Sequence, residues 1–208
     1  INDIIRIFDG KTGEWLSQVL SINKENIVLR VNEKKRDMIK NLDIWLIFAP
    51  IKQYRMNIAI QKATELGATA IIPCLTEYTN IKSINVENLK LNAIKAAEQS
   101  ERLEIPSIKT PVELKSLLNS WPDDRCLIYC DEKLHQENSI LRSLLPLRDQ
   151  ILKWAVLVGP EGGFSDSEKE MIGNIKNLLK VSLGKRLLRS DTAITVALFC
   201  VQEFVRDK

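Results

Sequence analysis

From residue 44 onward the sequence alternates between short apolar runs and longer stretches whose apolar residues recur every three to four positions. The short runs are typical of buried strands, and the longer stretches are typical of amphipathic helices. Strands that alternate with helices form a mostly parallel sheet with helices on both faces, because each parallel connection must cross over the sheet. The alternation therefore predicts an α/β fold.

The bounds of these elements follow from the same pattern. Strands are predicted at residues 44–49, 70–75, 126–130, 154–158 and 180–183, and helices at residues 54–66, 86–102, 112–118 and 191–206. Ser165 and Glu168 have the spacing of a capping box, so a further helix is expected to begin there. Pro73 lies inside a predicted strand and indicates an edge position or an irregular end, because proline lacks the N–H that a sheet requires.

The N-terminal segment has a different character. Short runs at residues 4–8, 15–22 and 27–31 predict strands. Three short strands cannot bury a core alone, so we expect further strands or the main domain to cover them. Residues 32–41 are polar and basic, which favours a linker. The chain is therefore expected to comprise a small β-domain, residues 1–36, and an α/β domain, residues 40–208.

Composition narrows the class of protein. The hydrophobic share of 45% and the charged share of 27% are ordinary for a soluble globular protein, and the net charge of +3 is compatible with RNA binding without arguing for it. No run approaches the ~20 apolar residues of a membrane span, and no charged-then-apolar leader is present. We therefore expect no membrane association and no secretion. The first residue is Ile1 rather than methionine, so we expect some of the natural N-terminus to be missing.

The cysteines and the single histidine argue against a metal centre. Cys74, Cys126, Cys130 and Cys200 form no Cys-x-x-Cys pair, and the only histidine is His135, so a zinc site is not expected. Cys126 and Cys130 would lie on the same face of one strand as buried, reduced packing residues. Such cysteines suit a reducing cytoplasm, where we expect the protein to work.

A glycine-rich turn follows the strand at residues 154–158. It reads Gly159-Pro-Glu-Gly-Gly163 and leads into the helix that Ser165 caps. Glycines permit positive φ and a close approach of the backbone to a ligand. The turn matches neither the GxGxxG pattern nor a Walker loop, so a ligand site and a plain strand-to-helix connection both remain open. It lies at the carboxyl end of the sheet, where α/β proteins bind ligands.

A second loop, residues 184–193, places two leucines among basic residues just before the last helix. Leu187 and Leu188 could line an apolar pocket for an adenine ring or pack into the core. Arg189 could pair with a carboxylate or meet an anion in the site. Ser190 or Asp191 could simply cap the helix.

Several separated motifs together carry more information than either loop. They are Gln61-Lys-Ala-Thr-Glu-Leu-Gly67, Ile72-Pro73 with Thr76-Glu77, Ala96-Ala-Glu-Gln-Ser100 with Arg102, Val158-Gly-Pro-Glu-Gly-Gly-Phe-Ser165, and Ser182-Leu-Gly-x-Arg-Leu-Leu-Arg-x-x-Thr-Ala193. In this order they resemble the motifs of the RsmE family of rRNA uridine methyltransferases, within the SPOUT class. The resemblance extends over residues 44–206, and residues 3–10 resemble the later part of that family's N-terminal PUA-like barrel.

The resemblance implies a fold and a function. The fold would be a SPOUT-type parallel sheet with a C-terminal trefoil knot, preceded by a partial PUA-like β-barrel that binds RNA. The cofactor would be S-adenosyl-L-methionine, with no metal. The protein would act as a homodimer and methylate N3 of a uridine in 16S rRNA within the assembled 30S subunit.

The resemblance also implies site residues. Those expected to bind the cofactor are Leu75, Val158, Gly159, Glu161, Gly162, Gly163, Leu183, Gly184, Leu187, Leu188 and Thr192. Those expected to contact the RNA are Arg55, Lys62, Glu98, Arg102, Lys185 and Arg186. The alternative for Glu98 and Arg102 is a surface ion pair one helical turn apart.

Methyl transfer to uracil N3 requires removal of the N3 proton, because the neutral nitrogen has no free lone pair. A nearby cation favours the anionic base. Arg189 is the candidate for that role. Glu161 is the candidate proton acceptor, with Glu98 as the alternative.

Three residues depart from the family pattern. Tyr78 stands where an arginine or a similar residue is common, Glu101 where glycine is usual, and Asp191 where glutamate is usual. The strands that normally precede Asp3 are absent. Two other functions suit the same fold: methylation of another acceptor such as a tRNA ribose 2′-hydroxyl, and a non-catalytic role in ribosome assembly. The upstream motifs favour RsmE over the first, and the intact loops count against the second.

Overall fold

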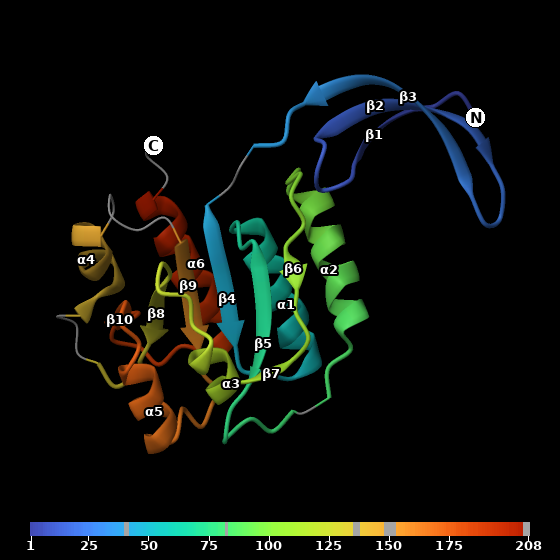
Figure 1. Ribbon diagram of the computed structural model, residues 1–208. Coiled ribbons are helices and arrows are strands. Elements are labelled where there is room, and N and C mark those ends of the chain that lie inside the picture. Colours follow the sequence, from blue (N-terminus) through green and yellow to red (C-terminus); the bar gives the residue numbers. More distant parts are fainter. Residues whose placement is uncertain (40–41, 82, 135–137, 148–152, 206–208) are drawn as a thin grey trace.

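The computed structural model describes residues 1–39, 42–81, 83–134, 138–147 and 153–205, which form a small antiparallel sheet and a larger α/β unit (Figure 1). The strands are β1 (Ile4–Phe8), β2 (Glu14–Ile22), β3 (Ile27–Arg36), β4 (Asp43–Phe48), β5 (Ala70–Leu75), β6 (Ser107–Ile108), β7 (Val112–Glu113), β8 (Cys126–Cys130), β9 (Lys153–Val158) and β10 (Leu178–Val181). The helices are α1 (Gln53–Glu65), α2 (Val86–Gln99), α3 (Leu114–Asn119), α4 (Ile140–Leu144), the 3-10 helix η2 (Leu145–Leu147), α5 (Asp166–Gly173) and α6 (Ser190–Val205).

The larger sheet is parallel throughout its described part. Its strands are paired in the order β10-β8-β9-β4-β5-β6, and β7 also pairs with β5. Each of these pairings is parallel, which confirms the predicted α/β fold. All the strands therefore end at one edge of the sheet, called the carboxyl edge below, and begin at the opposite, amino edge.

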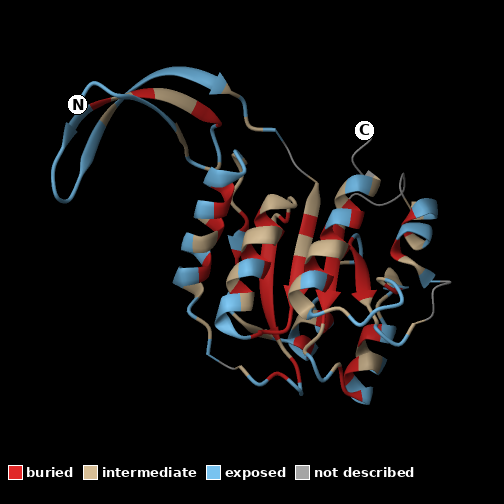
Figure 2. Ribbon diagram, turned by 180° about the vertical axis from the view of Figure 1, so that it is seen from behind, coloured by how far each residue is buried: buried red, intermediate tan, exposed pale blue. Residues whose placement is uncertain are grey.

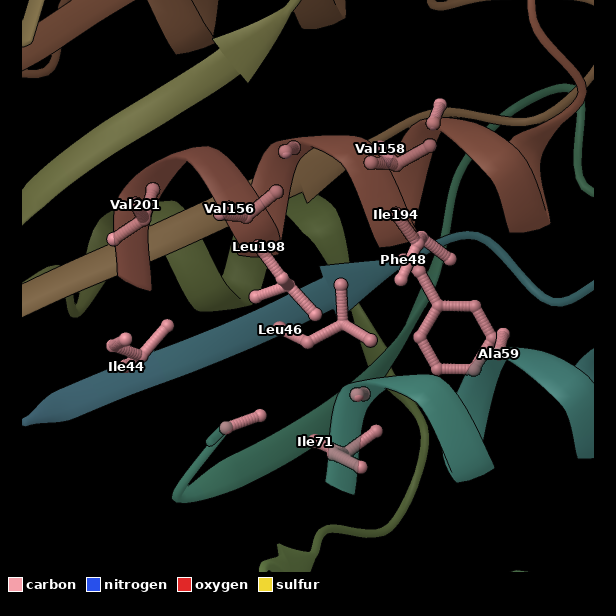
Figure 3. Close-up of a cluster of buried hydrophobic side chains, with 14 of the residues drawn as sticks. Ile44, Leu46, Phe48, Ala59, Ile71, Val156, Val158, Ile194, Leu198 and Val201 are labelled. Atoms are coloured by element: carbon pink, nitrogen blue, oxygen red, sulfur yellow. The ribbon is translucent and has the colours of Figure 1, made fainter. Parts of the chain in front are cut away.

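Helices cover both faces of this sheet. Ile44, Leu46 and Phe48 alternate along β4 toward the face covered by α1, α2 and α6, whereas Ile47 belongs to the core on the face of α3 and α5. Figure 3 shows the first core, where side chains of α6 and β9 meet those of β4. Full burial of such a side chain contributes about 1.5–3 kcal/mol. The buried stripes of α1, α2 and α6 accordingly face the sheet (Figure 2).

Arg125 joins three strands at the amino edge. It immediately precedes β8, and its guanidinium donates to the carbonyl oxygen of Trp154 in β9 at 2.8 Å. It also pairs with the Asp43 carboxylate of β4 at 2.6 Å and lies 3.6 Å from the centre of the Trp45 ring. A guanidinium can be buried here because a carboxylate, backbone carbonyls and an aromatic face replace its water.

Pro73 does not mark β5 as an edge strand, because β5 has neighbours on both sides. On one side, β6 pairs with Ala70 and Ile71, and β7 pairs with Cys74 and Leu75. The Ile71 carbonyl accepts from Lys109 N–H on that side, and Pro73 has the same orientation two residues later. Pro73, which lacks an N–H, therefore faces the gap between the short strands β6 and β7. This gap is an irregularity of the kind that the proline predicted.

Several predicted bounds are wrong by a few residues. Residues 32–36 are strand rather than linker, because β3 stays paired with β2 as far as Arg36. Residues 112–113 are strand β7, so the predicted helix begins only at Leu114. The last strand lies at Leu178–Val181, and α2 ends at Gln99. The short elements β6, α4 and η2 were not predicted, since two to five residues carry too little periodicity.

The cysteines are packing residues, as predicted. All four are free thiols, and Cys74, Cys126 and Cys200 are buried. Burial raises the pKa of Cys74, Cys126 and Cys130 to about 12, so these thiols stay protonated at neutral pH. His135 lies outside the described residues. Among the described helices, none combines the length and the apolar character needed to cross a bilayer.

Arg36 connects the small sheet to the end of α2. Its guanidinium makes two hydrogen bonds to the Glu14 carboxylate, at 2.8 and 3.0 Å, and these hold the pKa of Glu14 below its ordinary value. The same guanidinium donates to the carbonyl oxygen of Glu101 at 3.3 Å. A cavity of about 380 Å³ lies at this junction, lined in part by Arg6, Phe8, Glu98 and Leu103.

Glu101 is strained at this junction. It follows α2 with a φ of +54°, a left-handed conformation that costs a residue with a Cβ roughly 1–2 kcal/mol. Its carboxylate lies 3.9 Å from Arg36, and an exposed ion pair of this kind contributes roughly 0–1 kcal/mol. The backbone strain therefore costs more free energy than the ion pair contributes.

We predict that Glu101→Gly raises the free energy of unfolding by about 1 kcal/mol, because the strain exceeds the lost ion pair. Guanidinium-induced unfolding measures this. Glu101→Ala is the matched control, since it removes the carboxylate but keeps the Cβ. This variant should not raise the free energy of unfolding. A glycine variant no more stable than the alanine variant would contradict the strain argument.

Candidate functional site

The loop after β9 is shaped by a turn and a buried ring. Gly163 N–H donates to the Pro160 carbonyl at 2.9 Å, and Gly163 has a φ of +71°, which favours glycine. Phe164 then turns back into the core and packs edge-on against Tyr129 with ring centres 5.4 Å apart. A methyl group on Gly159 would lie only 2.6 Å from the Phe164 ring, so this glycine lets the loop fold over the phenylalanine.

One buried carboxylate holds the far end of this loop. Glu168 accepts from Ser165 N–H at 2.9 Å, and the Ser165 hydroxyl accepts from Glu168 N–H at 3.4 Å. This is the capping box that the sequence predicted. The other Glu168 oxygen accepts from Glu77 N–H at 2.9 Å, in the turn that follows β5. Glu168 thereby joins the loop after β9 to the loop after β5.

The second loop lies beside the first. The Ser190 hydroxyl, in the first turn of α6, donates to the Gly159 carbonyl oxygen at 3.5 Å. Leu188 packs against the core, whereas Leu187 is 78% exposed. Leu188 is only partly buried, so it packs on the core and keeps part of its side chain accessible, and Leu187 is free to meet a ligand or a partner.

Charged side chains surround both loops. Lys185, Arg186 and Arg189 are exposed on the second loop. Arg55, near the start of α1, pairs with Glu161 of the first loop at 3.1 Å. A hydrogen bond to the Tyr54 hydroxyl, together with the negative charges of Asp191 and Glu161, raises the pKa of Arg55.

Asp191 is half-buried at the start of α6. Its Oδ1 atom is buried and has no hydrogen-bond partner among the described atoms. The carboxylate acts electrostatically on Arg55 without a direct hydrogen bond between them. Asp191, which stands where the family usually has glutamate, thus lies close enough to the Arg55–Glu161 ion pair to act on it electrostatically.

The structure brings most of the predicted site residues to the carboxyl edge. The residues expected to bind a cofactor end β5 and β9, follow β9 and β10, or lie in the first turn of α6, and these elements meet at one edge (Figure 1). Arg55, Glu161, Lys185, Arg186 and Arg189 border the same edge. Within residues 1–39, 42–81, 83–134, 138–147 and 153–205, no group of three or more His, Cys, Asp or Glu side chains is placed to hold a metal ion.

Three predicted RNA contacts lie elsewhere. Lys62 is in the last turn of α1, toward the amino edge, and pairs with Glu65 at 2.7 Å. Glu98 is at the end of α2, beside the small sheet. Arg102 is only 10% exposed and donates to the Thr64 carbonyl at 2.6 Å.

The surface pair considered for Glu98 and Arg102 is also not formed. Because α2 ends at Gln99, Arg102 does not lie one helical turn beyond Glu98. Its guanidinium pairs with Glu104 at 2.9 Å instead. Burial lowers the pKa of Arg102, and Glu104 opposes this shift.

Comparison with known proteins identifies the family. Residues 38–202 match the sequence profile of the RNA methyltransferase domain family. The ribosomal RNA small subunit methyltransferase E of Rickettsia conorii is 37% identical over 198 residues, which cover 95% of this chain and 80% of that protein. The chain belongs to the RsmE family.

Two solved methyltransferase structures have the same fold. A ribosomal RNA small subunit methyltransferase E from Neisseria gonorrhoeae bound to S-adenosyl methionine has a TM-score of 0.84 and 27% identity, over 97% of this chain and 83% of that one. A putative methyltransferase from Legionella pneumophila in complex with the cofactor SAM has a TM-score of 0.82 and 27% identity, over the same shares of the two chains, 97% and 83%. RsmE membership therefore agrees with the observed α/β fold.

Sequence reasoning missed part of this RsmE-family site. It identified Glu168 only as a helix cap, because the bond to Glu77 joins residues that are 91 positions apart. It treated Tyr78 as a departure from a pattern, whereas the Tyr78 side chain lies against Gly162. No sequence motif indicated a role for Tyr54, since its hydrogen bond with Arg55 depends on side-chain orientation.

We predict that Gly159→Ala lowers the free energy of unfolding by about 1–3 kcal/mol, because the added methyl group displaces the buried Phe164 ring. Thermal unfolding measures this. Gly173→Ala is the matched control, since an added methyl group there meets nothing within 4 Å, and alanine at this helical position should be neutral or stabilising. Equal stability of the two variants would show that Phe164 does not constrain the loop.

Proposed function

We propose that this protein is an S-adenosyl-L-methionine-dependent methyltransferase that modifies N3 of a uridine in 16S rRNA of the 30S subunit. The observation that carries this proposal is the 37% identity to a ribosomal RNA small subunit methyltransferase E over 95% of the chain. Two solved structures of similar proteins hold S-adenosyl methionine. The ribosomal substrate would place the activity in the cytoplasm.

The two loops fit this cofactor. A Cβ added to Gly163 or Gly184 would meet nothing within 4 Å, so the backbone of both loops is open to a ligand. We propose that backbone groups of residues 159–163 and 183–184 bind its polar parts and that Leu75, Leu187 and Leu188 contact its adenine ring. Thr192 and Val158 complete the proposed cofactor set.

When bound, the cofactor supplies a methyl group activated by its positively charged sulfur. The chain must hold uracil N3 in line with that group and remove the N3 proton, and positioning of this kind can account for much of the acceleration. We propose that the Glu161 carboxylate accepts the proton while Arg189 stabilises the negative charge on the base. The cofactor held by the two loops would supply its methyl group to that nitrogen and would leave as a neutral thioether.

Charge around the site supports RNA binding. Arg55 holds the Glu161 carboxylate at 3.1 Å and would orient it toward the base. Lys185 and Arg186 are exposed on the same edge, and we propose that they contact phosphate groups. Lys62, Glu98 and Arg102 lie toward the amino edge and are not part of this proposed contact surface.

We also infer the predicted knot. On one side of β10, the Val181 carbonyl accepts from Asp131 N–H at 2.9 Å. On the other side, Ser182 N–H donates to the Asn138 carbonyl at 2.8 Å, and the Ser182 carbonyl accepts from Ile140 N–H at 3.2 Å. Asp131 and Asn138 both belong to the connection between β8 and α4. The end of β10 thus lies between two parts of one connection, which supports a chain that threads through it.

The proposal includes a homodimer and a PUA-like RNA-binding barrel. Tyr54 and Ile58 on α1 and Phe199 on α6 are exposed apolar residues, and these two helices lie side by side, which supports a symmetric subunit contact (Figure 2). The three antiparallel strands β1, β2 and β3 leave apolar side chains exposed, as in part of a barrel.

Mass spectrometry of nucleosides tests the activity. Undermethylated 30S subunits and tRNA are each incubated with the protein and labelled cofactor. We expect labelled 3-methyluridine from 30S subunits. Label in tRNA alone, or label in a ribose methyl group, would overturn the proposed substrate.

We predict that Gly162→Val weakens cofactor binding at least about tenfold, because its side chain would push into the loop's ligand face and against Tyr78, whose Cβ is 3.3 Å from an added Cβ. Isothermal titration calorimetry measures the affinity. Gly173→Ala serves as control. An unchanged affinity would remove this loop from the cofactor site.

We predict that Arg189→Ala lowers kcat about 100-fold, as expected when one charge-stabilising group is lost from an active site, without changing the unfolding midpoint. Arg189→Lys should retain part of the activity, because it keeps the positive charge. Single-turnover methylation of 30S subunits measures the rate. Wild-type turnover in the alanine variant would exclude Arg189 from the mechanism.

A further inference from the structure

The turn after β5 presents an aromatic ring beside the proposed site. Tyr78 lies in the middle of residues 76–79 and is 46% exposed. A Cβ on Gly162 would lie 3.3–3.7 Å from the Cβ, Cγ and Cδ2 atoms of Tyr78. The tyrosine therefore borders the glycine-rich loop that carries the proposed proton acceptor, Glu161.

This turn is rigid. Thr79 N–H donates to the Thr76 carbonyl at 3.1 Å, and Thr76 N–H donates to the Thr79 hydroxyl at 3.0 Å. The two hydroxyl groups are 2.8 Å apart, and both threonines are buried. The backbone on either side of Tyr78 is thus closed by three hydrogen bonds.

The turn is also held in a constant position relative to the loop. Glu77 N–H, immediately before Tyr78, donates to Glu168, whose other oxygen accepts from Ser165 N–H at the end of the glycine-rich loop. Because Glu168 is buried, water competes weakly for these bonds. The Glu168 carboxylate therefore bonds the turn that carries Tyr78 to the end of the loop, and a surface that positions a substrate needs such support.

The chemistry of the proposed reaction calls for such a surface. N3 lies on the hydrogen-bonding edge of uracil, so the base must be unpaired and that edge must face the methyl group. A contact with the flat face of the base holds it while leaving the edge free. Aromatic side chains make this contact with unstacked bases in single-stranded RNA.

We propose that the Tyr78 ring stacks on the target uracil and holds its N3 edge toward the cofactor. This inference rests on the proposed function and adds a substrate-binding residue to it. The basic side chains of Lys185, Arg186 and Arg189 border the same edge and would hold the flanking phosphates. The role belongs to the ring rather than to the hydroxyl, which makes no hydrogen bond to the described residues.

The test compares four variants in steady-state methylation of 30S subunits. Tyr78→Ala should lower kcat/KM roughly 5- to 150-fold, the range for loss of one base–aromatic contact. Tyr78→Phe should stay within about twofold of wild type, because the stacking face is retained. Tyr78→Leu should resemble the alanine variant, since it restores bulk without an aromatic face. Leu141→Ala, at an exposed apolar residue on α4, is the control and should match wild type.

Cofactor affinity and the unfolding midpoint are measured for each variant and should not change. Full activity of Tyr78→Ala, or rescue by leucine equal to that by phenylalanine, would overturn the stacking role. A fall in cofactor affinity would assign the ring to the cofactor instead, and loss of the dimer would assign it to a subunit contact. Absence of 3-methyluridine with the wild-type protein would instead refute the proposed function itself, so the two failures are distinguishable.

Discussion

Parallel pairing of the strands is the constraint from which the rest of this structure follows. Since every described pairing in the larger sheet is parallel, each connection must return the chain across a face before the next strand begins. These crossover connections contain the helices that bury both faces of the sheet. They also bring the loops after β5, β9 and β10 to one edge, although these loops are far apart in the sequence.

At that edge, the Glu168 carboxylate joins two loops that are far apart in the sequence. Glu168 completes the cap of its own helix and accepts from the backbone of the turn after β5. The two loops of the candidate site are therefore coupled through a single buried side chain. The Ser190 hydroxyl adds the third loop through the Gly159 carbonyl. At the resulting edge, three loops, one of them glycine-rich, are joined to one another by these hydrogen bonds.

The features predicted from the sequence are those with local causes. Apolar runs located the central strands, and the spacing of Ser165 and Glu168 located the start of α5. The features that were missed depend on distant partners. Arg125 stabilises the amino edge through Asp43 and Trp154, and Arg102 donates a hydrogen bond to the Thr64 carbonyl oxygen. Neither role follows from neighbours in the chain. Polar residues 32–36 resembled a linker because β2, rather than a hydrophobic core, keeps them extended.

The length of α2 has a consequence for the size of the target. This helix runs from the carboxyl edge back to the small sheet, and its 14 residues rise by about 21 Å (Figure 1). Under the proposed function, an RNA that contacts both the small sheet and the loops of one subunit must span at least this length. A footprint of that extent is offered by a folded region of RNA. A free nucleotide or a dinucleotide would reach only one of the two surfaces.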